Sequence, residues 1–289
     1  MDRPAPLPRG SAREVALTSR RPTREMGADT GGAIAPCQAA RPRARRVTLP
    51  IMLVAAAVCP CPPLLVPEVA VGAAPEMDAV RAACTDALGV LAAARPDLLI
   101  VVGPAGPGEG GVFPQGGRGS FKGYGVDLDV RLGAGTQDAT AERELPSSLA
   151  VGAWLLERTG WADAPVEGVG VEETLTPERC ADRGRELGER ADRVALLVLG
   201  DGSACRTVKA PGYLDERAAP YDAATARALA TADLPALLSL DADLARTLKS
   251  SGRAPWQILA GAAEGTDLDG TLLYEDAPYG VGYMVATWS

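Results

Sequence analysis

The chain has 289 residues, 47% of them hydrophobic and 23% charged, which is enough apolar content for one large domain or two small ones. It contains no histidine, which excludes His-based triads, His general bases and His metal ligands from any mechanism that this chain carries alone. The net charge of −8 gives no support for a nucleic-acid partner. No apolar run reaches the ~18 residues that a membrane-spanning helix needs, so we expect no membrane partner.

Residues 1–46 differ from the rest of the chain. They hold ten arginines and four acidic residues, a net of +6, which leaves −14 for the remainder. They lack hydrophobic periodicity, so we interpret them as a disordered Arg/Pro-rich tail before a single domain over 47–289. Three explanations stay open: a start codon assigned too early, with the true start near Val47 or Met52; an Arg-rich segment for an acidic partner; or a signal peptide, since 41–58 is basic and then apolar. We favour the first.

The positions of the six cysteines indicate whether the protein works in a reducing or an oxidising compartment. One lies in the tail, and Cys84 and Cys180 fall in helical patterns, which a disulfide framework does not favour. We therefore expect a reduced, cytoplasmic protein. Export is the alternative if residues 41–58 are a signal segment.

Strand and helix signals alternate from residue 51 onward. Short apolar or alternating runs predict strands at 51–58, 98–102, 124–132, 166–171, 194–199, 270–274 and 281–288. Helical periodicity, proline positions and N-caps predict helices at 75–94, 146–159, 177–190 and, with breaks, 221–263. This alternation predicts an α/β fold, a three-layer α/β/α sandwich with a central, mainly parallel, mixed sheet.

Ligands of such sheets bind beyond the carboxyl ends of the strands. Three predicted strand ends are marked by the loops 59–63, 103–111 and 200–205. If the strands are neighbours, these loops line one crevice, in which we expect a small molecule to bind. The expected pocket residues are Cys59, Cys61, Pro63, Gly103, Pro104, Gly200, Asp201, Gly202 and Ser203.

Two residues of the third loop are candidate catalytic groups. Asp201 could act as a general base or cation ligand and Ser203 as a substrate contact, although a tight turn explains both residues equally well. No histidine is present to activate Ser203, and Lys209 is a weak candidate proton donor. The glycine-rich loop 103–111 lacks the lysine of a phosphate-binding loop, and its prolines disrupt a GxGxxG geometry, so we favour a lid or turn.

The pair Cys59-Pro-Cys61 raises the question of a metal. Thiolates bind zinc, but a lone CxC pair is more simply interpreted as two small hydrophobic side chains at a strand end. Cys205 could join Cys61 in a thiolate site only if their strands are adjacent. We expect no metal, and these two cysteines are the candidates should one bind.

Five segments resemble the class III extradiol ring-cleavage dioxygenase (LigB-like) superfamily, which includes the MEMO family, and in particular its actinobacterial branch. They include Cys59-Pro-Cys-Pro-Pro63 and Leu199-Gly-Asp-Gly-Ser203, and they cover 57–68, 95–104, 145–156, 196–204 and 221–261. The resemblance implies an α/β/α sandwich around a mixed sheet. It also implies, for active members, non-haem Fe(II) held by two histidines and a glutamate, with a further histidine as acid/base.

Every ligand position that this resemblance identifies is replaced. Cys61 occupies the turn of the first histidine, and the loop Gly103-Pro-Ala105 replaces the second. Ala204-Cys205 and Pro255–Gln257 stand where the acid/base histidine and the glutamate are expected. A resemblance in fold therefore does not imply ring-cleavage activity for this chain.

We thus expect a LigB-like domain whose iron site is lost and whose crevice is a degenerate or repurposed small-molecule site. One alternative is an oxidoreductase with a metal site rebuilt from Cys61, Cys205 and Asp201. The other is a MEMO-like interaction module that holds a partner's peptide in the crevice.

Overall fold

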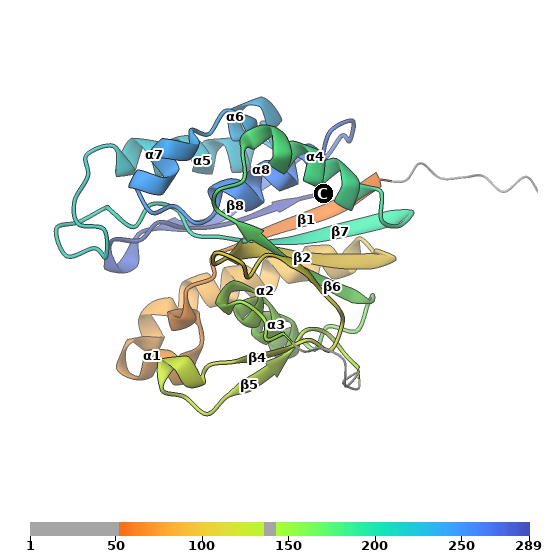
Figure 1. The fold of residues 1–289 in the computed structure, drawn as a ribbon, viewed down its shortest axis with the longest axis horizontal. Coiled ribbons are helices and arrows are strands. Elements are labelled where there is room, and N and C mark those ends of the chain that lie inside the picture. Colours follow the sequence, from red (N-terminus) through yellow and green to blue (C-terminus); the bar gives the residue numbers. More distant parts are fainter. Residues whose placement is uncertain (1–51, 136–142) are drawn as a thin grey trace, which may run out of the picture. The chain divides into compact units, whose positions relative to one another are not determined.

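The computed structural model describes residues 52–135 and 143–289 (Figure 1). The predicted tail over 1–46 lies outside the described residues. Within them, seven strands form one mixed sheet in the order β3-β6-β2-β7-β1-β9-β8. The strands are β1 (Met52–Cys59), β2 (Leu98–Ala105), β3 (Gly111–Phe113), β6 (Val166–Glu172), β7 (Arg193–Leu199), β8 (Gly270–Asp276) and β9 (Tyr283–Trp288). The predicted α/β sandwich with a mainly parallel sheet is confirmed.

The four central strands β6, β2, β7 and β1 are parallel, while β3, β9 and β8 are added antiparallel at the two sides. Strands buried on both faces are continuously apolar, and every residue of β7 from Val194 to Leu199 is buried. Alternate side chains enter opposite layers: Ala55 and Ala57 pack in one core, Ala56 and Val58 in the other.

Helices cover both faces of the sheet (Figure 1). One layer holds α2 (Asp78–Ala93), α3 (Ser147–Thr159) and a small sheet of β4 (Arg118–Ser120) and β5 (Asp129–Arg131), with α1 (Pro67–Ala70) beside them. The other layer holds α4 (Pro177–Gly188), α5 (Ala218–Ala230), α6 (Leu234–Leu238), α7 (Ala242–Thr247) and α8 (Arg253–Ala262). Among the described residues no helix is both long and apolar enough to cross a membrane.

Helices α4 and α8 approach closely because glycines line their contact. A Cβ added at Gly184 would collide with the Ile258 carbonyl, and one added at Gly261 would collide with the backbone of Ala181. Small residues at a crossing let two backbones meet, and here they hold α8 close against α4.

Three local predictions need correction. The alternating segment 124–132 forms a strand only at Asp129–Arg131, because a 3-10 turn at Lys122–Tyr124 ends in Gly125, whose φ is +82°. The helix predicted from Pro75 begins at Asp78, after a 3-10 helix over Val71–Met77. The glycine-rich loop predicted over 103–111 is shorter, because β2 continues to Ala105 and β3 begins at Gly111.

Candidate functional site

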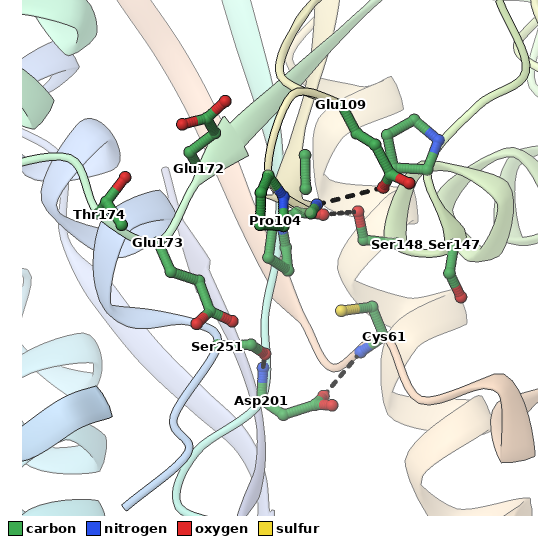
Figure 2. A pocket seen from close by; sticks show the side chains of 14 residues that line it. Cys61, Pro104, Glu109, Ser147, Ser148, Glu172, Glu173, Thr174, Asp201 and Ser251 are labelled. Atoms are coloured by element: carbon green, nitrogen blue, oxygen red, sulfur yellow. Dashed lines mark hydrogen bonds between the residues drawn. The ribbon is translucent and has the colours of Figure 1, made fainter. Parts of the chain in front are cut away.

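A cavity of about 430 Å³ opens at the carboxyl edge of the four parallel strands (Figure 2). Each strand end contributes to it: Cys61 follows β1, Pro104 lies at the end of β2, Glu172 ends β6, and Asp201 follows β7. The lining residues are Cys61, Pro104, Ala105, Gly106, Pro107, Glu109, Pro146, Ser147, Ser148, Glu172, Glu173, Thr174, Asp201 and Ser251. This is the edge at which open α/β sheets bind ligands.

The loops after β1 and β7 meet at the floor of the cavity. The strands pair in parallel so that Cys59 lies opposite Leu199, and their carboxyl ends are level. Beyond them the Cys61 amide donates a hydrogen bond to Oδ1 of Asp201, 2.8 Å away, although the two residues are 140 positions apart. The Asp201 amide donates to Oγ of Ser251 at 3.0 Å. Two backbone anchors therefore hold the Asp201 carboxylate at the cavity.

Burial sets the ionisation of these two floor residues. It raises the pKa of the half-buried Asp201 carboxyl to about 7, against the lowering effect of the Cys61 amide. Burial, reinforced by the charge of Asp201, raises the pKa of the Cys61 thiol well above its usual value. Asp201 can therefore gain or lose a proton near neutral pH, while Cys61 stays a neutral thiol.

Three glutamates stand around the floor, and two of them hold the loop after β2. Glu109 accepts a hydrogen bond from the Gly106 amide at 3.2 Å, and Glu172 accepts one from the Gly108 amide at 3.0 Å. Glu173 is exposed, and in the view of Figure 2 its carboxylate extends toward Ser251 and Asp201.

The loop that carries Glu173 is fixed from behind by a buried cation. The Arg253 guanidinium donates to the Leu175 carbonyl at 2.6 Å and to the Glu173 carbonyl. These partners are backbone carbonyls, so Arg253 positions the loop through its main chain and not through the Glu173 carboxylate. The charged side chains that line the cavity itself are all carboxylates in the described residues.

The remaining wall is apolar with hydroxyl groups at its edge. Pro104, Pro107 and Pro146 supply the apolar surface. At the start of α3, the Ser148 hydroxyl donates to the Pro104 carbonyl at 2.5 Å, and the Ser147 hydroxyl lies 2.8 Å from that of Tyr124. An apolar wall with a few placed polar groups is typical of small-molecule sites.

Several expected pocket residues lie away from the cavity because of close packing. Cys59 is fully buried beside Cys84 in the core, since its side chain points into the helix layer. Gly103 lies inside β2, which extends beyond the predicted end at residue 102, and faces Ser148. Pro63 begins a 3-10 turn. The glycines at 200 and 202 are packed against Gly252 and Asp222 respectively, with no room for a ligand.

Ser203, expected as a substrate contact, belongs to a buried polar cluster. Its side chain is 0% exposed, and both its amide and its hydroxyl donate to the Asp222 carboxylate at 2.7 Å. Arg206 donates to the same carboxylate at 3.0 Å. Asp222, on α5 and 1% exposed, thus joins the loop after β7 to the helix layer. The role of Ser203 is structural.

The rebuilt metal site is not formed in the part of the chain that the structure describes. Cys205 is buried in a separate small core, where its thiol donates to the Leu248 carbonyl at 3.4 Å. No three His, Cys, Asp or Glu side chains of residues 52–135 and 143–289 come together as metal ligands. Lys209 is exposed and does not line the cavity.

The chain also does not fit the iron that the resemblance implies. Gln257 stands near the position expected for the glutamate, and its amide donates to the carbonyls of Leu238 and Leu240. Its carbonyl oxygen accepts from Arg253 at 3.0 Å. This side chain is therefore fully engaged within the helix layer.

Sequence reasoning misses part of the lining. Glu172 and Glu173 follow a predicted strand, so applying the strand-end rule to the run 166–171 would have identified them. Ser251 lies between two helices and carries no such signal. Ser148 is the second residue of α3 and faces the cavity only because α3 packs across the end of β2.

Comparisons with known proteins add little. No protein-family model matches the chain. No curated protein matches it. Among solved structures, an uncharacterized protein from Escherichia coli K12 is similar over 81% of this chain and 99% of its own, with 14% sequence identity and a TM-score of 0.44. At this level of similarity no function transfers from one protein to the other.

Proposed function

We propose that the protein binds a small organic molecule in the cavity at the carboxyl edge of its parallel strands. We propose further that it is a LigB-like domain whose ring-cleavage iron site has been lost. The observation that carries the first part is the cavity itself, where loops from four strands place Cys61, Asp201 and Glu173 beside an apolar wall. A cavity of this size lies in the usual range of roughly 300–1,000 Å³ for small-molecule sites.

The second part rests on the sequence and on the residues present. The chain has no histidine, and its fold is of the class that the resemblance implies. Because an extradiol iron site needs histidine ligands, the full chain mixed with Fe(II) and catechol in air is expected to give no yellow ring-opened product above a blank. Sustained turnover would overturn the proposed loss of the iron site.

The binding proposal is tested by a fragment screen on the full chain, using ligand-observed NMR. Thr174 lines the cavity and is exposed on a turn, so Thr174→Trp fills the opening without disturbing the core. Glu216→Trp places the same side chain on the surface away from the cavity and is the matched control. We expect hits that Thr174→Trp weakens and the control does not. Hits that bind both variants equally would place binding elsewhere.

A further inference from the structure

The carboxylates of the cavity come from three separate loops and are the only charged groups that line it in the described residues. Asp201 lies at the floor, and Glu109, Glu172 and Glu173 surround it. No lysine or arginine of residues 52–135 and 143–289 lines the cavity to neutralise them. The side chains that line the cavity therefore carry net negative charge, which favours a cation.

All four carboxylates retain free acceptor capacity, but two of them are tied to the loop after β2. Glu109 and Glu172 are engaged by backbone amides of the glycine-rich loop. At the floor, Asp201 accepts one hydrogen bond, at Oδ1 from the Cys61 amide, and the Glu173 carboxylate accepts none within the described ranges. A carboxylate can accept several hydrogen bonds, so both groups can receive N–H donors from a ligand.

Cys61 gives an independent indication that the cavity holds a ligand. Its side chain is 7% exposed, and in the described part of the chain its thiol has no hydrogen-bond partner. Figure 2 shows its sulfur pointing into the space between Pro104 and Asp201. The thiol is a weak donor that faces the cavity without a partner of its own, so a ligand atom can contact it there.

The arrangement suits an organic cation better than a metal ion. A bound Ca²⁺ or Mg²⁺ needs several oxygens within about 2.0–2.6 Å of one point. No three possible ligands converge in this way among the described residues. An ammonium or guanidinium group instead reaches spaced carboxylates through separate N–H bonds, and the prolines of the wall offer apolar surface to the rest of such a molecule.

We propose that the cavity takes a small organic cation, an amine or a guanidine on an apolar body. Its charged group lies between Asp201 and Glu173, and its apolar part lies against Pro104 and Pro146. The Cys61 thiol contacts it at the floor. This inference rests on the proposed function, and it specifies the charge and chemical class of the ligand.

Three probes with the same phenylethyl body and different charge test the inference. They are phenethylamine, the neutral phenethyl alcohol and the anionic hydrocinnamate, each titrated by NMR into the full chain at about pH 8, above the pKa of about 7 of Asp201. We expect the amine to bind at least about 10-fold more tightly than the alcohol, which is the effect of one charge-assisted hydrogen bond, and the anion to bind least.

Two variants that each remove one negative charge test where the charged group of the ligand lies. Asp201→Asn keeps the acceptor for the Cys61 amide, and Glu173→Gln changes only an exposed residue, so both retain the fold. Each is expected to weaken amine binding about 10-fold and to leave alcohol binding unchanged. Asp163→Asn and Glu216→Gln remove exposed carboxylates outside the cavity and are the matched controls.

The outcomes separate this inference from the proposed function. If the alcohol or the anion binds as tightly as the amine, and Thr174→Trp abolishes that binding, the cavity binds small molecules but the cation inference fails. If amine binding survives both neutralising variants, the charge placement is overturned. If the screen and all three probes show no binding in the cavity, both proposals fall.

Discussion

The folded environment of Asp201 disfavours the ionised form of its carboxyl group. Its pKa rises from 3.8 to about 7 because of burial, so the folded protein binds a proton that the unfolded chain has released. Stability therefore falls as the pH rises from about 4 through about 7. Burial, reinforced by the Asp201 charge, raises the pKa values of the neighbouring Cys61 thiol and Tyr283 hydroxyl, so both groups remain neutral over this range.

The first prediction is that Asp201→Asn removes this pH dependence. Relative to wild type, its free energy of unfolding should rise between about pH 4 and pH 8 by on the order of 1–3 kcal/mol, since one pKa unit is worth about 1.4 kcal/mol and the carboxyl is partly exposed. Urea unfolding of both proteins across that range is the measurement. A constant difference would mean that Asp201 titrates normally in the folded protein.

Asp222 carries the second prediction at this scale. It accepts from the Ser203 amide and hydroxyl and from Arg206, so Asp222→Ala leaves all three donors without their acceptor. We expect a loss of about 3–5 kcal/mol in the free energy of unfolding. Asp243→Ala breaks an exposed ion pair with Arg246 and should cost about 1 kcal/mol or less. Equal effects in the two variants, measured by denaturant unfolding, would contradict the structural role of the cluster.

Among the elements, the α4–α8 contact gives the sharpest prediction. Gly261→Ala inserts a methyl group where the Ala181 backbone lies, and we expect a cost of about 1–3 kcal/mol or more from overpacking. Gly89→Ala is the matched control, because Gly89 is exposed in α2 with open space around it and should gain about 0.5–1 kcal/mol. Thermal unfolding of the two variants should therefore shift in opposite directions. A neutral result at Gly261 would show that the helices separate easily.

Element prediction succeeds where burial dominates the sequence pattern. Strands β1, β2 and β7 contain continuous apolar runs because both faces are covered, and the sequence pattern predicts them together with β6, whose valines at 166, 169 and 171 are buried. It overestimates the strand over 124–132 because the alternation there has another cause: Val126 and Leu128 pack on the core from an irregular loop, while Lys122 pairs with Asp127 and Asp129. Alternation alone does not distinguish these two arrangements.

The site is predictable only in part, for a physical reason. The rule that ligands bind beyond strand ends identifies Cys61, Pro104 and Asp201, because it needs only the position at which each strand ends in the sequence. It cannot tell which way a side chain turns after the strand. Ser203 turns toward Asp222 in a helix that follows it by 19 residues, and no local pattern reveals this contact.

For the whole molecule, the state of the cysteines bears on where the protein works. Cys59, Cys61, Cys84, Cys180 and Cys205 are free and buried. We predict that these five thiols react with a thiol reagent only after unfolding, without added reductant. Rapid labelling of the native protein would contradict their burial. Disulfides in the denatured protein would instead favour export.

The central claim is that a small molecule occupies the cavity at the carboxyl edge of the parallel strands. The most direct measurement is the amide NMR spectrum of isotope-labelled full-length protein during titration with phenethylamine. The Cys61 amide, bonded to Asp201, should shift most strongly, together with that of Ala105, while the Gly89 amide on the exposed face of α2 stays constant. Shifts confined to residues outside the cavity, or no shift at Cys61 at saturation, would contradict the account.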